Sequence, residues 1–119
     1  MRSLKIGIIG SRGHAASIIS IVKKKIRDDD LVIFHPSVTE IKFEDLLICD
    51  AIMIVSPDHT HYEYLKKIVD ANYSGRIFCE KIPVNQSSEL EIFSHLNPNR
   101  TFFNFNLRYS ILADKIRKH

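Results

Sequence analysis

The chain has 119 residues, of which 45% are hydrophobic and 26% are charged, which is typical of one globular domain. Its net charge of +3 is too small to indicate nucleic-acid binding. No apolar run approaches the roughly 20 residues of a membrane span, and Lys5 and the early glycines do not fit a signal peptide. Because Cys49 and Cys79 adjoin strand patterns without a paired framework, we expect buried free thiols and a cytoplasmic protein.

The first half of the chain alternates apolar strands with an amphipathic helix. Residues 5–10 form a run of β-branched residues that ends in glycine, which predicts a first strand. Residues 31–34 predict a second buried strand. Apolar and polar residues alternate weakly over residues 38–43, as in a short strand, and residues 44–48 fit one helical turn. A helix is expected after the first strand, where apolar residues recur at helical spacing: Ala15, Ile18, Ile19, Val22 and Ile26.

The second half continues the same alternation. Residues 51–55 predict a buried strand, and residues 60–71 predict a helix that follows it. The inward face of this helix is expected to comprise His61, Tyr64, Leu65, Ile68 and Val69. Residues 76–79 predict another strand, residues 101–105 a last strand, and residues 110–118 a final helix.

Between the last two strands the sequence predicts one more helix. Ser88 and Glu91 fit a capping box at its start, and Leu90, Phe93 and Leu96 are its apolar residues. Strands that alternate with helices predict an α/β fold, a single domain in which helices cover both faces of a doubly wound parallel sheet. In such a sheet, the loops after the strands meet at one edge and form the ligand crevice.

The loop after the first strand has the composition of a phosphate-binding turn. The segment Gly10-Ser11-Arg12-Gly13-His14-Ala15 matches the dinucleotide fingerprint G-x-G-x-x-G/A at Gly10 and Ala15, with Arg12 at the second glycine position. Glycines let the backbone approach a pyrophosphate, and a helix N-terminus supplies N–H donors. Taken alone, the loop fits two interpretations equally, a phosphate site and a strand–helix turn without a ligand.

The residue after the second strand bears on the choice of cofactor. NAD sites usually have Asp or Glu there to accept the ribose hydroxyls, but this chain has His35. Imidazole can bond a hydroxyl without repelling a 2′-phosphate, which Arg12, Ser37 and Lys42 could contact. The pattern slightly favours NADP over NAD, although His35 could equally be the end of an exposed strand.

Polar residues also follow the two later strands. Asp58, His59 and His61 are metal-ligand types, but no further cluster completes a set, so we expect no metal site. Lys81 follows a buried strand beside Glu80, and its ammonium group could stabilise a developing alkoxide. For these two residues alone, a surface ion pair is the simpler interpretation.

Four segments, taken together, resemble motifs of the glucose–fructose oxidoreductase and inositol dehydrogenase (Gfo/Idh/MocA) family. They occur in the same order and at similar spacing as in that family, and the resemblance covers essentially the whole chain. They are the glycine loop, Ser56-Pro57-Asp58-His59-Thr60-His61, Cys79-Glu80-Lys81 and Asn106-Leu107-Arg108. The resemblance implies a Rossmann-like NAD(P)-binding domain over residues 1–109, with Lys81 beside nicotinamide and substrate as the catalytic residue. The cofactor-binding residues that it adds to the glycine loop and His35 are Ser56, Pro57, Asp58, His61, Glu80 and Arg108.

The sequence departs from the family pattern at two further positions. Ile82 replaces a proline, and Asp58 replaces the more usual asparagine. Family members continue into a second α/β domain with the substrate pocket, the catalytic histidine and most of the subunit interface. We therefore expect residues 110–119 to begin the helix that leads to that domain, which this sequence does not include.

Two functions remain open from the sequence. The resemblance implies the nucleotide-binding domain of an NAD(P)-dependent oxidoreductase that acts on a sugar, cyclitol or related alcohol and is inactive without its second domain. The alternative is a stand-alone Rossmann-type module that binds a nucleotide or CoA. A stand-alone module would not explain the presence of Glu80-Lys81 or of Asn106-Leu107-Arg108. The oxidoreductase interpretation is therefore favoured.

Overall fold

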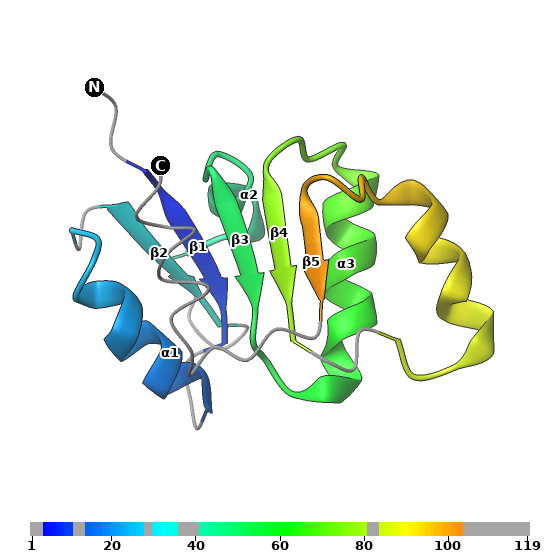
Figure 1. Cartoon of the computed structure of the whole chain (residues 1–119), viewed down its shortest axis with the longest axis horizontal. Helices are drawn as coiled ribbons and strands as arrows, with labels where there is room; N and C mark the ends of the chain where they lie inside the picture. The colour runs from blue at the N-terminus through cyan, green and yellow to red at the C-terminus, as the bar shows by residue number, and fades with distance from the viewer. Residues whose placement is uncertain (1–3, 11–13, 28–29, 36–40, 81–83, 104–119) are drawn as a thin grey trace.

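The computed structural model describes residues 4–10, 14–27, 30–35, 41–80 and 84–103, and for His14 and Asp58 the backbone alone. Within these residues, five strands form one sheet in the order β2-β1-β3-β4-β5 (Figure 1). Every neighbouring pair of strands in this order is parallel. The predicted α/β class with a parallel sheet is confirmed.

The elements of the sheet agree closely with the predicted strands. The strands are β1 (Ile6–Ile9), β2 (Leu31–Phe34), β3 (Ala51–Ile54), β4 (Arg76–Cys79) and β5 (Thr101–Phe103). The helices are α1 (His14–Lys23), α2 (Phe43–Leu46) and α3 (His61–Asp70), with 3₁₀ helices η2 (Asp58–Thr60) and η3 (Ser87–His95). The residues of β2 are only half-buried, which corrects the prediction of a buried strand: β2 lies at the edge of the described sheet.

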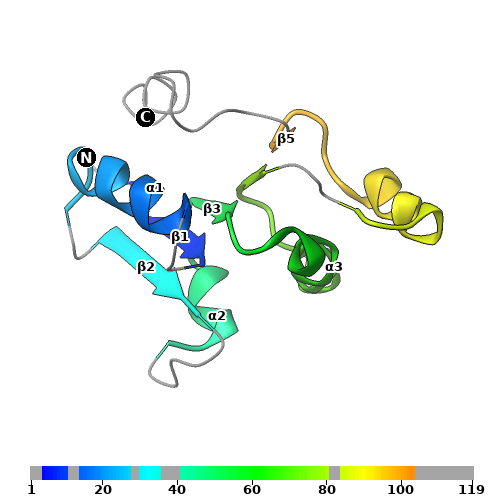
Figure 2. The ribbon, with the colours of Figure 1, turned by 90° about the horizontal axis from the view of Figure 1, so that it is seen from below.

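Helices cover both faces of the sheet. Figure 2 shows α1 on one side of the strands and α2 and α3 on the other. Successive strand residues point to opposite faces, so Ile8 and Met53 belong to the core beneath α1, while Ile9 and Ile52 belong to the core beneath α3. The doubly wound arrangement predicted from the alternation of elements is confirmed.

The strand order reverses between β1 and β3. After β1 the chain moves to β2 on one side, and it returns to β3 on the other side of β1. In open parallel sheets, ligands bind outside the carboxyl ends of the strands at such a reversal. The two loops that begin at Gly10 and Val55 follow these strands.

The start of η3 differs from the predicted capping box. The carboxylate of Glu89 accepts the backbone N–H groups of Asn85 (2.7 Å) and Gln86 (3.3 Å). The prediction that Ser88 and Glu91 form this box was wrong, because the chain turns into the helix two residues earlier than expected.

The apolar residues of η3 also face differently from the expected pattern. Ile92 is the buried residue of this helix, whereas Leu90 and Phe93 are exposed. In a 3₁₀ helix residues three apart are aligned, so Leu90 and Phe93 share one outward face.

The weak strand predicted over residues 38–43 is also wrong where the structure describes it, because Phe43 begins α2. Residues 36–40 lie outside the described residues.

Tyr73 ties the turn after α3 to the start of β3. Its hydroxyl donates to the Cys49 carbonyl oxygen at 2.7 Å. Gly75 makes room for this ring, because a Cβ there would overlap it and lie 2.8 Å from the Asp50 carbonyl oxygen. Both cysteines are buried free thiols, as predicted.

Burial keeps the Cys49 thiol and the Tyr73 hydroxyl protonated. Desolvation raises the pKa of Cys49 from 9.0 to about 11; the charges of Asp50 and Asp45 add to this rise and that of Lys5 opposes it. Desolvation, with Cys49 and Asp50, also raises the pKa of Tyr73 above its ordinary 10.0. Both pKa values are higher in the folded state than in the unfolded chain. The free energy of unfolding is therefore unaffected by the ionisation of these two groups below pH 9, and it falls as the pH rises through 11.

We therefore expect wild-type protein to lose stability from pH 9 to pH 11, and the Tyr73→Phe variant to lose less over the same interval. At neutral pH the variant should be less stable by about 1 kcal/mol, because its bond to the Cys49 carbonyl is missing. Thermal unfolding followed by circular dichroism across this pH range measures both effects. Parallel declines in the two proteins would contradict a contribution from Tyr73.

Candidate functional site

The carboxyl ends of four neighbouring strands meet at one edge of the sheet. Gly10, Ser56 and Glu80, which follow β1, β3 and β4, are thereby brought to this edge, as the sequence predicted. Backbone hydrogen bonds continue past the strand ends and fix this alignment: Gly10 N–H to Phe34 O (3.0 Å), Val55 N–H to Ile9 O (3.1 Å) and Glu80 N–H to Ile54 O (3.1 Å).

Gly10 lies close to the start of the loop that follows β3. Its φ is 122°, a conformation that side chains strongly disfavour. A Cβ at this position would lie 3.1 Å from Ser56 N and 3.3 Å from the Ala15 side chain. The absence of a side chain therefore brings the end of β1, the loop after β3 and the first turn of α1 together.

The start of α1 suits an anion. This helix begins at His14, soon after Gly10, and its first turn carries no acidic residue. The N–H groups of a helix's first turn have no partner within the helix and lie at the positive end of its dipole. The absence of a side chain at Gly10 and the N–H groups at the N-terminus of α1 thus suit the pyrophosphate of a dinucleotide.

Two hydroxyl groups order the loop after β3. The Thr60 hydroxyl donates to the Pro57 carbonyl oxygen at 2.6 Å, and it lies 2.7 Å from Ser56 Oγ. Because the Thr60 hydroxyl has only one hydrogen, Ser56 is the donor in the second bond. Ser56 Oγ consequently keeps acceptor capacity at the sheet edge. For Thr60 the sequence offered one signal, a hydroxyl side chain at the start of a predicted helix.

His61 lies beneath the same loop. Its side chain is 0% exposed, as its inward position in the helix pattern predicted. Its Nε2 lies 2.7 Å from the Ser56 carbonyl oxygen. A carbonyl oxygen only accepts, so Nε2 carries the hydrogen of this bond. The structure thus shows His61 holding the backbone of Ser56, and the direct cofactor contact implied by the family resemblance would require the ring to become exposed.

The remaining predicted site residues divide into two groups. His35 and Glu80 are half-buried at the ends of β2 and β4, and Pro57 is exposed in the loop after β3. The backbone of His14 and Asp58 begins α1 and η2 respectively. The other predicted site residues lie outside the described part of the chain: Ser11, Arg12, Gly13, Lys81 and Arg108.

Within the described ranges, no three His, Cys, Asp or Glu residues gather where they could hold a metal ion. The helices of those ranges are also too short or too polar to span a lipid bilayer.

No protein-family model and no curated protein matches the sequence. Solved structures do share the fold, with sequence identities too low to show more than that. A dehydrogenase (MviM) from Clostridium difficile aligns with a TM-score of 0.68 and 21% identity over 99% of this chain and 44% of its own. An NAD-binding protein from Listeria innocua aligns with a TM-score of 0.62 and 17% identity over 96% of this chain and 41% of its own.

An NAD binding oxidoreductase from Klebsiella pneumoniae gives a TM-score of 0.58 at 17% identity, over 98% of this chain and 39% of its own. The chain thus spans less than half the length of each of these three neighbours. The fold that the resemblance to the glucose–fructose oxidoreductase and inositol dehydrogenase family implies is thereby confirmed.

Proposed function

We propose that this chain is the nucleotide-binding domain of an NAD(P)-dependent oxidoreductase that acts on a sugar, cyclitol or related alcohol. The observation that carries the proposal is the left-handed Gly10, packed against Ser56 where the strand order reverses and followed by α1. The three solved neighbours support it, since they are a dehydrogenase, an NAD-binding protein and an NAD binding oxidoreductase.

Each described residue has a specific part in this proposal. Gly10 and the N-terminus of α1 hold the pyrophosphate, and Ser56 Oγ accepts a hydrogen bond from the nicotinamide half. His61 keeps the Ser56 backbone in place. Glu80 lies at the carboxyl end of β4, where its backbone N–H donates to the Ile54 carbonyl oxygen of β3. The bound dinucleotide supplies the hydride-transfer chemistry, and the protein supplies binding, orientation and electrostatics.

Titration of NADH, NADPH and CoA against the purified chain, by calorimetry or by nicotinamide fluorescence, tests this proposal. We expect both dinucleotides to bind and CoA not to compete with them. Binding of CoA alone would support the alternative, a stand-alone CoA-binding module, and binding of none of the three would contradict both functions.

His35 is proposed to set the choice between NAD and NADP. It ends β2, next to β1, where a carboxylate would repel a 2′-phosphate. We expect wild-type protein to bind NADPH at least as tightly as NADH, and His35→Asp to bind NADH more tightly than NADPH. The ratio of the two dissociation constants in each protein measures this. A strong preference of the wild type for NADH would contradict the assignment.

Lys81 is proposed as the catalytic residue, because it follows Glu80 in the sequence and Glu80 ends β4 at the same edge of the sheet as Gly10 and Ser56. Its ammonium group would stabilise a developing alkoxide on the substrate. Proton removal also needs a general base, and His61 is buried against the Ser56 carbonyl. We therefore propose that the base and the substrate pocket belong to a second domain.

It follows that the 119-residue chain by itself should oxidise no polyol at a measurable rate in the presence of NAD or NADP. In a longer protein that carries the second domain, Lys81→Ala should lower kcat by more than it weakens dinucleotide binding, because the lysine acts on the transition state. Steady-state kinetics and dinucleotide titration separate the two effects. Robust turnover by the chain alone that survives Lys81→Ala would contradict both proposals.

A further inference from the structure

The Thr60 hydroxyl fixes the direction of a short chain of hydrogen bonds in the loop after β3. Its single hydrogen goes to the Pro57 carbonyl oxygen at 2.6 Å, because a carbonyl group can only accept. Ser56 Oγ lies 2.7 Å from Thr60 Oγ1, so the hydrogen of Ser56 points to Thr60. The chain of bonds therefore runs in one direction, from Ser56 through Thr60 to Pro57.

This direction gives Ser56 Oγ one chemical character toward a ligand. Because its hydrogen is held by Thr60, the oxygen presents lone pairs and no donor. A hydroxyl or N–H group of a ligand can bond to it, whereas an ionised phosphate oxygen, which also only accepts, is repelled. The bond between His61 Nε2 and the Ser56 carbonyl oxygen, at 2.7 Å, holds the backbone from which this side chain extends.

Ser56 lies next to the position proposed for the pyrophosphate. A Cβ at Gly10 would be 3.1 Å from Ser56 N, and the Val55 N–H bond to the Ile9 carbonyl oxygen keeps the two strand ends aligned. In a dinucleotide each phosphate is attached to a ribose, and the nicotinamide ring is farther away by the width of that sugar. A ribose hydroxyl group is therefore the nearest donor that the dinucleotide can offer to Ser56.

We propose that Thr60 is a positioning residue that makes Ser56 Oγ select the hydroxyl group of the nicotinamide ribose over a phosphate group. This inference rests on the proposed function, since it requires a dinucleotide at Gly10. Thr60 acts through Ser56: it holds the Ser56 hydrogen away from the pyrophosphate, so that the ribose is the group fixed against the loop after β3. The Thr60→Val variant would release this hydrogen and let Ser56 donate to a phosphate.

Calorimetric titration with ADP, ADP-ribose and NADH at pH 8 tests the proposal, because ADP ends at a phosphate, ADP-ribose adds the ribose and NADH adds the nicotinamide. Ser56→Ala should weaken ADP-ribose and NADH binding by the same factor, about fivefold for one hydrogen bond, and should not weaken ADP binding.

The two variants of Thr60 separate positioning from a merely structural role. Thr60→Val should bind ADP about fivefold more tightly than wild type, through the new bond from Ser56, and its preference for ADP-ribose over ADP should fall by the same factor. Damage to the loop would weaken binding and would not produce this gain. Thr60→Ser keeps the hydroxyl group and should retain the wild-type ratio of the ADP and ADP-ribose dissociation constants.

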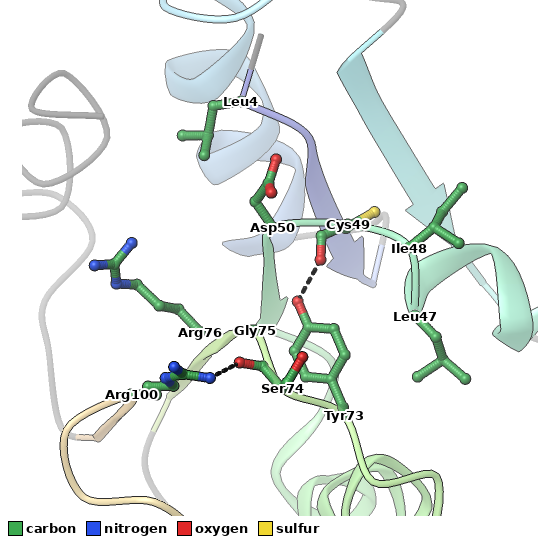
Figure 3. A pocket seen from close by; sticks show the side chains of 10 residues that line it. All are labelled: Leu4, Leu47, Ile48, Cys49, Asp50, Tyr73, Ser74, Gly75, Arg76 and Arg100. Atoms are coloured by element: carbon green, nitrogen blue, oxygen red, sulfur yellow. Dashed lines mark hydrogen bonds between the residues drawn. The ribbon is translucent and has the colours of Figure 1, made fainter. Parts of the chain in front are cut away.

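Thr101→Val is the matched control, because it makes the same chemical change at the opposite edge of the sheet. Thr101 begins β5 directly after Arg100, whose guanidinium group donates to the Ser74 carbonyl oxygen at that edge (Figure 3). Among the described residues Thr101 Oγ1 is buried without a hydrogen-bond partner. This variant therefore loses no bond and should keep wild-type affinity for all three ligands.

Equal ratios of the ADP and ADP-ribose dissociation constants in wild type and Thr60→Val would overturn the proposal. So would weaker ADP binding in Ser56→Ala, which would place a phosphate against Ser56, or a loss confined to NADH, which would place the carboxamide there. A dinucleotide still binds in each of these outcomes, so the proposed function would stand. If wild type binds none of the three ligands, the inference and the proposed function both fail.

Discussion

Gly10→Ala should remove measurable dinucleotide binding and destabilise the folded chain. The φ of Gly10 is 122°, and holding alanine there costs about 2 kcal/mol. The added Cβ would also lie 3.1 Å from Ser56 N, a backbone atom that cannot rotate away. The two loops must therefore separate, and the cradle proposed for the pyrophosphate is both widened and partly filled by the methyl group.

The expected fall in melting temperature is roughly 10 °C, because about 1 kcal/mol corresponds to roughly 5 °C in a chain of this size. Circular dichroism gives the melting temperature, and NADH titration at a temperature where the variant remains folded gives the affinity. Unchanged affinity in folded Gly10→Ala protein would contradict the proposed binding mode.

Gly7→Ala is a control on the same strand. A Cβ at Gly7 would lie 2.8 Å from Leu46 Cδ2 and 3.2 Å from Cys49 Sγ, so this variant should also be destabilised. However, these contacts lie in the core between β1 and the segment around α2, away from Ser56. Folded Gly7→Ala should bind NADH with wild-type affinity, which separates loss of the site from loss of stability.

The His61→Leu variant should be about 2 kcal/mol less stable than wild type and should bind the dinucleotide more weakly. Leucine cannot donate to the Ser56 carbonyl oxygen, which His61 Nε2 contacts at 2.7 Å. A buried carbonyl that loses its partner has a cost of this size. Without this bond the loop after β3 loses an anchor next to Gly10, so the proposed site should be less well ordered.

His59→Ala tests the specificity of this effect. His59 is exposed in η2, two residues from His61, and its replacement should change stability by less than about 0.5 kcal/mol. His61→Gln keeps an N–H donor and should recover part of the dinucleotide affinity. Denaturant unfolding and NADH titration of the three variants provide the comparison. Full affinity in His61→Leu protein would show that His61 serves the core alone.

Much of the fold was predictable because local pattern and tertiary environment agree. The apolar runs at residues 51–54 and 77–79 are strand segments in which every residue is buried, and buried strands need apolar side chains at nearly every position. The helix at residues 61–70 has its apolar residues at helical spacing. The prediction was weaker in η3, where three-residue spacing of Leu90 and Phe93 fits an α-helix facing the core and a 3₁₀ helix facing outward equally well.

The sequence by itself determined the alternation of strands and helices, the parallel sheet and the convergence of Gly10, Ser56 and Glu80 at one edge. These follow from the order of elements and from the rule that parallel strands end at a common edge. It also placed His61 on an inward face, because helical periodicity depends only on residue spacing.

The tertiary structure alone decided which atoms meet. Gly10 has a positive φ and lies close to Ser56, which follows a strand distant in the sequence. His61 bonds the Ser56 carbonyl because the loop after β3 folds back over the start of α3. Sequence patterns report which face a residue occupies, whereas register and loop geometry, which arise only when strands pair, determine its partners.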